Sequence, residues 1–142
     1  MEQSKTCSFP AVCASLEAIS LQVKEAADVA GLDDDAAYAI QLAVEEACDN
    51  IIEHAYGNNM RGDIECTCEA TPDGLVVTLR DHGDPFDPDS VPPPNLDSSL
   101  EERDAGGLGL HFIRKLTDDF CFQFDAEQGN VLMLFKRRSS SE

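Results

Sequence analysis

The sequence predicts an α+β fold in which helices cover one face of a mixed, mostly antiparallel sheet. Two segments with helical periodicity come first along the chain, and two pairs of segments with strand alternation come after them. This order favours a helix layer on an antiparallel sheet, since a parallel sheet would need helices and strands to alternate. With 142 residues, of which 42% are apolar, the chain is sized for one domain, residues 1–142, with a sizeable core.

A short strand at residues 4–9 and two helices make up the predicted N-terminal half. Apolar residues at helical spacing indicate the first helix, and Gly31 ends it. These residues are Val12, Leu16, Ile19, Val23, Ala26 and Ala30. The second helix opens at Asp33-Asp34-Asp35, because acidic residues in the first turn suit the N-terminal end of the helix dipole. This helix ends near residues 57–59, and its apolar residues are Ile40, Val44, Ala47, Cys48, Ile51 and Ala55.

Strand alternation replaces helical spacing from residue 63 onward. Apolar residues alternate with acidic or polar ones over residues 63–70, which predicts a strand with one wet, acidic face. Pro72-Asp73-Gly74 predicts a turn, and residues 75–80 then return as the second strand of a hairpin.

The C-terminal part is predicted as a long loop, a short helix and a second hairpin. Residues 82–107 contain five prolines among many acidic residues and serines, and a loop of this length is commonly functional. We expect a mobile lid at about residues 88–105, since few large apolar side chains there offset the entropy of ordering. The later elements are a helix at 108–116, a strand with Phe120, Phe122 and Phe124 on one face, a turn at 128–130 and a strand at 131–135.

The charge of the chain limits the ligands it can bind. Ten basic and 28 acidic residues give a net charge of −18, which disfavours binding to a nucleic-acid backbone or an anionic membrane surface. A phosphate ligand would need a metal ion or oriented backbone dipoles. No run approaches the roughly 20 apolar residues of a membrane span, and residues 1–5 lack the features of a signal peptide, so we expect a cytoplasmic location.

The six cysteines contain no CxxC pair, which makes a zinc ribbon an unfavourable interpretation. Cys66 and Cys68 are two residues apart, and on a strand both side chains lie on one face. We interpret them as small apolar core residues in a reducing compartment rather than as metal ligands or disulfide partners.

Two polar residues on the second helix are candidates for chemistry. Glu46 and Asn50 are spaced i and i+4, so they share one face, roughly 130° from the apolar stripe at about 100° per residue. This face is either simply solvated, or it pairs a carboxylate base with an amide oxygen that binds a hard cation such as Mg²⁺.

The segment after the first hairpin supplies a second candidate. Asp81 stands at the end of a strand and Gly83 follows two residues later. The pair is either a simple turn or a ligand site. In the second case Asp81 accepts a hydrogen bond from an exocyclic amine, and Gly83 allows a flat ligand to approach the backbone.

Glycines and one arginine at the end of the long loop form the third candidate. Gly106, Gly107, Leu108 and Gly109 open a predicted helix, where backbone N–H groups and the helix dipole favour an anion. The segment fits neither a Walker P-loop nor a dinucleotide fingerprint. Arg103 is either a surface residue or a phosphate contact just before these glycines.

The order of these three motifs resembles the ATPases of the gyrase, heat-shock chaperone, histidine-kinase and mismatch-repair superfamily, or GHKL superfamily. Residues 46–56 (EACDNIIEHAY) resemble its N-box, Asp81 to Asp87 its first glycine box, and Gly106 to Leu110 its second. The resemblance covers residues 6–136 and is greatest to the small serine kinases that act as anti-sigma factors. It implies a Bergerat-type two-layer α/β sandwich that binds Mg²⁺-ATP under a lid.

The resemblance also implies roles for individual residues. Glu46 matches the general base and Asn50 the Mg²⁺ ligand. Asp81 matches the acceptor for the adenine amino group, and Gly83 the glycine beside the base. The matches to the phosphate-binding segment are Gly106, Gly107, Leu108 and Gly109, together with Arg103 as a lid arginine.

The implied function is an ATP-dependent serine/threonine kinase. Its substrate would be an anti-anti-sigma (STAS) domain protein, and it would also bind a sigma factor; a homodimer is left open. The alternatives are a nucleotide-responsive binding module without phosphotransfer and a detached histidine-kinase-like ATPase domain. Glu53 disfavours the last, since histidine kinases usually carry a basic residue three positions after the N-box Asn.

Overall fold

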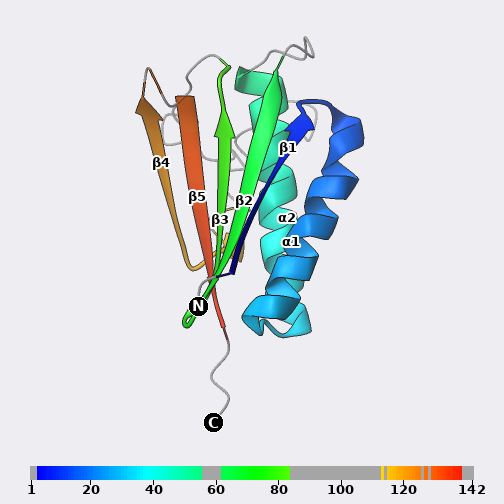
Figure 1. The fold of residues 1–142 in the computed structure, drawn as a ribbon, viewed down its shortest axis with the longest axis vertical. Helices are drawn as coiled ribbons and strands as arrows, with labels where there is room; N and C mark the ends of the chain where they lie inside the picture. The colour runs from blue at the N-terminus through cyan, green and yellow to red at the C-terminus, as the bar shows by residue number, and fades with distance from the viewer. Residues whose placement is uncertain are drawn as a thin grey trace, which may run out of the picture.

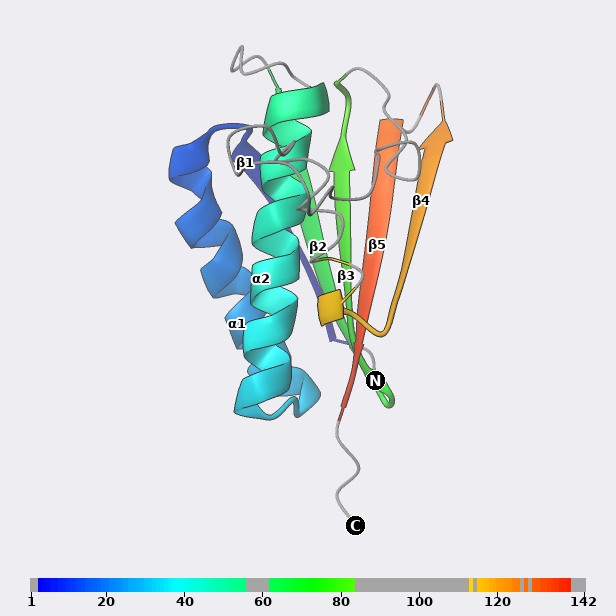
Figure 2. The same ribbon diagram turned by 180° about the vertical axis from the view of Figure 1, so that it is seen from behind.

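Two long helices cover one face of a five-stranded sheet (Figure 1). Seen from behind, the helices form a separate layer in front of the strands (Figure 2), and this two-layer α+β arrangement confirms the predicted fold class. The computed structural model describes residues 3–55, 62–83, 113, 115–125, 127 and 129–138. None of the described helices combines the length and apolar character needed to cross a membrane.

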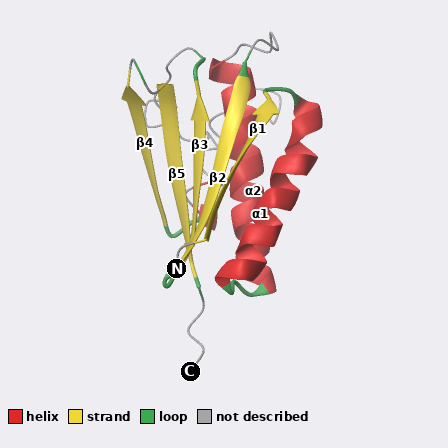
Figure 3. Cartoon of the chain, in the orientation of Figure 1, coloured by secondary structure: helices red, strands yellow, loops and turns green. Residues whose placement is uncertain are grey.

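The elements follow one another along the chain as two helices between strands (Figure 3). They are β1 (Gln3–Pro10), the 3₁₀ turn η1 (Cys13–Ser15), α1 (Leu16–Ala30), α2 (Asp34–Asn50), the π-helical turn η2 (Ile51–Ala55), β2 (Asp63–Thr71), β3 (Gly74–Asp81), β4 (Asp119–Asp125) and β5 (Gly129–Arg137).

The sheet has the strand order β1-β2-β3-β5-β4, and every described pair is antiparallel. The predicted hairpin at residues 63–80 is confirmed, with Thr71 opposite Gly74 across its turn. β5 comes last in the chain yet lies inside the sheet, between β3 and β4, so its first residues lie beside the end of β3.

Both helix boundaries have local causes. α1 begins at Leu16 rather than Val12, because the intervening residues Cys13–Ser15 form the 3₁₀ turn. It ends at Gly31 in the left-handed conformation, as predicted. α2 is capped by Asp33, whose side chain accepts a hydrogen bond of 2.8 Å from the backbone N–H of Ala36.

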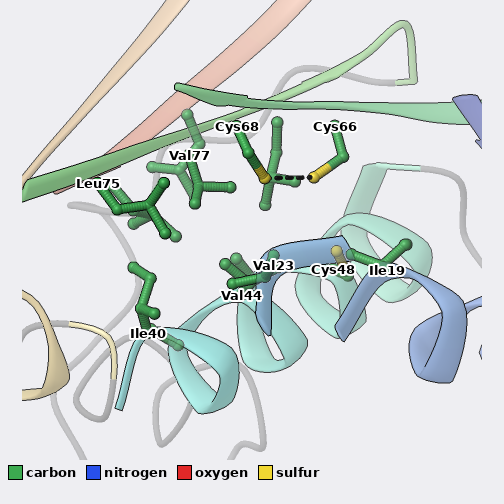
Figure 4. Close-up of a cluster of buried hydrophobic side chains, with 14 of the residues drawn as sticks. Ile19, Val23, Ile40, Val44, Cys48, Cys66, Cys68, Leu75 and Val77 are labelled. Atoms are coloured by element: carbon green, nitrogen blue, oxygen red, sulfur yellow. Dashed lines mark hydrogen bonds between the residues drawn. The ribbon is translucent and has the colours of Figure 1, made fainter. Parts of the chain in front are cut away.

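The core lies between the helices and the inner face of the sheet (Figure 4). α1 contributes Ile19 and Val23, α2 contributes Ile40, Val44 and Cys48, and the strands contribute alternate residues. From β2 and β3 these include Ile64, Cys66, Cys68, Leu75, Val77 and Leu79. The interpretation of Cys66 and Cys68 as core residues is therefore confirmed.

β4 and β5 form the predicted second hairpin, but its turn does not extend to Gly129 and Asn130 as predicted. Gly129 and Asn130 already belong to β5, where they pair with Asp125 and Phe124 of β4. Gly129 has a φ of +89°, and a Cβ built there would lie 2.3 Å from the backbone oxygen of Asp81. The strand can begin this close to β3 only because residue 129 has no side chain.

Replacing Gly129 by Ala is expected to destabilise the protein far more than replacing Gly31 by Ala. Both glycines have positive φ, which costs an alanine roughly 1–2 kcal/mol. At Gly31 the new Cβ meets only the end of the flexible Arg138 side chain at 3.0 Å, whereas at Gly129 it meets backbone. Measured by urea unfolding, the free energy of unfolding should fall by about 2–3 kcal/mol more for Gly129→Ala than for Gly31→Ala. Equal losses would contradict the close approach of β5 to Asp81.

Candidate functional site

The candidate residues on α2 and β3 lie at the same end of the molecule. α2 and β3 run in the same direction and both end at the upper edge in Figure 2. Glu46 and Asn50 belong to the last two turns of α2, Asp81 is the last residue of β3, and Gly83 follows it. Four of the residues singled out from sequence are therefore gathered at one end of the sandwich.

Asp81 is a buried carboxylate, with 2% of its surface exposed. Its Oδ1 accepts hydrogen bonds from the backbone N–H of Gly83 at 2.9 Å and from the side-chain amide of Asn130 at 2.8 Å. Among the described residues no donor reaches Oδ2. One oxygen is thus fixed by the protein, and the other is left to accept a hydrogen bond from a ligand.

Burial raises the pKa of Asp81, while the hydrogen bonds from Asn130 and Gly83 and the proximity of His82 act in the opposite direction. The two hydrogen bonds stabilise the charged carboxylate, which is the form that accepts hydrogen bonds on both oxygens. The site thus favours a ligand with an N–H donor over one with only acceptors.

Asn130 is a site residue that sequence reasoning missed. Its side chain is only 1% exposed, and besides Asp81 its amide donates to the backbone oxygen of Gly83 at 3.4 Å. The Gly129-Asn130 pair in the sequence predicts part of a turn rather than a strand position. The signal that could have found it is the alternation of Leu132 and Leu134, which extends back to place residue 130 on the inner face of the strand.

Glu46 and Asn50 are both half-buried near the end of α2. Burial raises the pKa of the Glu46 carboxyl, and the negative charges of Asp49 and Glu45 raise it further. A carboxyl with a raised pKa is a stronger proton acceptor than an ordinary glutamate once it is ionised. Immediately after Asn50 the helix changes to the π-helical turn η2, a local distortion common at functional sites.

Cys48 lies on the core face of α2, away from Glu46 and Asn50. Its thiol is fully buried, and burial raises its pKa. Asp49, Glu45 and Asp81 raise the pKa further, so the carboxylate at the end of β3 lies near this part of α2. The thiol of Cys48 therefore stays protonated and serves as packing rather than as a nucleophile.

The side-chain oxygens at the end of α2 suit a metal ion that is bound together with an anionic ligand. Among the described residues no group of three or more His, Cys, Asp or Glu side chains could hold a metal ion. Asn50 offers one amide oxygen at the end of α2. Mg²⁺ commonly takes one or two protein ligands and completes its shell with phosphate oxygens and water, so the residues present fit a Mg²⁺-phosphate ligand.

Five predicted site residues lie outside the part of the chain that the structure describes. They are Arg103, Gly106, Gly107, Leu108 and Gly109. The expected lid at about 88–105 lies outside it too. Their roles stay predictions.

Comparisons with known proteins match the chain to an ATPase domain family and to serine-protein kinases. A family model described as histidine kinase-like ATPase domain matches residues 9–136. The chain is 32% identical over 129 residues to the serine-protein kinase RsbW of Bacillus cereus (strain B4264), covering 88% of this chain and 79% of that protein. Serine-protein kinases RsbW of Bacillus velezensis and Bacillus licheniformis are 32% and 30% identical over 88 and 91 residues, or 59% and 61% of this chain. These two matches span 55% and 57% of the length of those relatives.

The free energy of unfolding of the Asp81→Asn variant is expected to increase, relative to that of the unchanged protein, as the pH rises. The raised pKa means that the folded protein holds the Asp81 proton more tightly than the unfolded chain, whose aspartates titrate near about pH 4. The contribution of Asp81 to stability is thus fully present below about pH 4 and is lost as the pH rises through the folded pKa.

Urea unfolding of both proteins between about pH 4 and pH 8 measures this difference. The asparagine keeps an oxygen that can accept from Gly83 and Asn130, so the comparison isolates the charge. The free energy of unfolding of the variant minus that of the unchanged protein should increase with pH. If this difference is constant or falls as the pH rises, burial of the Asp81 carboxylate does not carry the expected cost.

Proposed function

Since the chain belongs to the histidine kinase-like ATPase family, we propose that it binds Mg²⁺-ATP where α2 and β3 end and phosphorylates a serine or threonine of a partner protein. The observation that carries the proposal is the geometry of Asp81. It is buried at the end of β3, with Oδ1 occupied by two protein donors and Oδ2 reached by none among the described residues.

In this proposal Asp81 recognises the adenine ring. The exocyclic amine of adenine is an N–H donor, and Oδ2 is the complementary acceptor in a buried position, where a hydrogen bond discriminates well. Gly83 has no side chain and leaves space beside its backbone for a flat ring. Asn130 and the Gly83 N–H hold the carboxylate in the orientation that this contact requires.

Asn50 is the proposed protein ligand to Mg²⁺, and Glu46 the proposed base. When bound, Mg²⁺ would supply positive charge for the phosphates and offset the net charge of −18 that this chain carries. Glu46 lies one helical turn before Asn50 and accepts the proton of the attacking hydroxyl group, a role that its raised pKa supports.

The segment from Arg103 to Gly109 completes the proposed site. Backbone N–H groups of Gly106, Gly107, Leu108 and Gly109 would contact the phosphates at the start of a helix, with Arg103 from the preceding lid. The relatives named serine-protein kinase support transfer to a serine or threonine. We propose a STAS-domain protein as the substrate and a sigma factor as a second partner, with phosphorylation of the first deciding whether the second is held.

Incubation with labelled ATP, Mg²⁺ and candidate STAS-domain proteins tests the function directly. Transfer of label to serine or threonine supports the kinase. Transfer to histidine would favour a histidine-kinase-like ATPase domain instead. ATP binding without transfer to any candidate would favour a nucleotide-responsive binding module.

Replacing Glu46 by Gln keeps the shape of the side chain and removes the proton acceptor. We expect phosphotransfer to fall by about 10²–10⁴-fold while the affinity for ATP changes little. The Glu17→Gln variant on α1 is the control, since Glu17 is exposed and is not among the groups that raise the pKa of Glu46. It removes the same charge and is expected to keep near-normal transfer. Near-normal transfer by Glu46→Gln would remove this residue from the mechanism.

Replacing Asn50 by Ala is expected to weaken ATP binding mainly when Mg²⁺ is present. Loss of a group that ligates or orients a metal lowers affinity by about 10–100-fold. Calorimetry with Mg²⁺, and again with a chelator in its place, separates the metal contribution from the fold. Equal losses under the two conditions would show that Asn50 acts by another route.

A further inference from the structure

A cavity between α1 and the β1–β2 edge of the sheet lies at the opposite end of the molecule from Asp81. β1 begins and α1 ends at the lower edge in Figure 1, whereas α2 and β3 end at the upper edge. The cavity measures about 440 Å³, within the range of small-molecule sites. Its walls include Lys5 of β1, Gln22, Glu25 and Ala26 of α1, and Cys68 and Ala70 of β2.

The Gln22 side chain in this wall has an unused acceptor. Gln22 is 7% exposed, and its amide nitrogen donates to the backbone oxygens of Lys5 and Cys66, both at 3.2 Å. Its Oε1 is buried and has no hydrogen-bond partner among the described residues. Buried polar groups are normally paired, so an unpaired oxygen in the wall of a ligand-sized cavity points to a donor brought by a ligand.

Cys68 places a sulfur atom in the same wall. Cys68 is 2% exposed, and it lies on the inner face of β2 directly opposite Lys5 of β1. The Sγ atoms of Cys66 and Cys68 are 3.9 Å apart (Figure 4). Cys66 does not line the cavity, so the two thiols differ in access.

The surroundings of the two thiols also separate their acidities. The hydrogen bond from Cys66 is the largest influence on Cys68 and lowers its pKa; burial opposes this, and the Lys5 ammonium lowers the pKa further. The same hydrogen bond and burial raise the pKa of Cys66. Of the two thiols, Cys68 is the one beside the Lys5 ammonium, and this position favours its thiolate, which is the nucleophilic form.

We propose that this cavity is a covalent modification site, in which Cys68 adds to a small α,β-unsaturated carbonyl compound that carries a carboxylate for Lys5 and an N–H or O–H donor for Gln22. The Cys68 sulfur forms a bond to the β carbon, and the π electrons of the carbon–carbon double bond move to the α carbon. The α carbon takes a proton from solvent, so the addition needs no oxidant and has no leaving group. The site is independent of the proposed ATP site.

Alkylation of the folded chain by iodoacetate and iodoacetamide tests access and charge separately. In each case the cysteine sulfur displaces iodide, and peptide mass spectrometry gives the rate for every cysteine. Cys68 should react at least about tenfold faster than Cys48 and Cys66, which are equally buried but have raised pKa values. Exposed Cys121 serves as the internal reference for each reagent.

Lys5→Gln should lower the iodoacetate-to-iodoacetamide rate ratio at Cys68 by about fivefold, the factor that one ion pair at 4 Å is worth in water. Lys24→Gln is the matched control, because it removes the same charge from an exposed residue that pairs with Asp28 outside the cavity. The ratio at Cys121 should not change in either variant. An equal effect of the two substitutions at Cys68 would overturn the role of Lys5.

Filling the cavity gives a second, steric test. Ala26→Leu should slow alkylation of Cys68 by both reagents, whereas Ala18→Leu makes the same change on the exposed face of the same helix and should not. Thermal unfolding checks that both variants are folded. If Ala26→Leu does not fold, the Lys5→Gln comparison decides. If Cys68 reacts no faster than Cys48 and Cys66 in the unchanged protein, the modification site does not exist.

Discussion

The carboxylate of Asp81 lies where the end of β3 meets the start of β5, and its need for hydrogen-bond donors constrains both strands. An ionised group with 2% exposure is costly unless it is paired, and its donors come from Gly83 and from Asn130 at the start of β5. Asn130 reaches Asp81 only because β5 lies beside β3 in the sheet. Gly129 lets the two strands approach this closely.

Hydrogen bonds between the helices, and between α1 and the sheet, hold α2 in place relative to this carboxylate. Gln41 of α2 donates to the hydroxyl and backbone oxygens of Ser20 on α1, and Ser20 in turn donates to Glu45. Gln22 ties α1 to β1 and β2. These contacts involve Gln41 and Glu45 on the side of α2 that faces α1, and none of them involves Glu46 or Asn50.

Periodicity in the sequence predicted the helices, the first hairpin and the core position of Cys66 and Cys68, because each depends on neighbours within one element. The order of strands was not predictable in this way: nothing local to residues 129–137 says that β5 lies inside the sheet rather than at its edge. Asn130 was missed for the same reason, since its role depends on a strand 49 residues away in sequence. The resemblance to serine kinases of the GHKL superfamily is confirmed by the family match and by the named relatives. It implied a shared ATP site for Glu46, Asn50, Asp81 and Gly83, for which spacing alone left alternatives open, and these roles stay predictions.

The two acids at this end of the molecule differ in what surrounds them, and this difference separates their proposed roles. Burial raises the pKa of both Asp81 and Glu46. At Asp81, donors from Asn130 and Gly83 oppose burial and favour the charged form, as a fixed hydrogen-bond acceptor requires. At Glu46, the neighbours Asp49 and Glu45 act in the same direction as burial and increase its affinity for a proton, as a general base requires. Burial thus acts in the same direction on both acids, and the groups that surround them differ: two hydrogen-bond donors at Asp81 and two negative charges at Glu46.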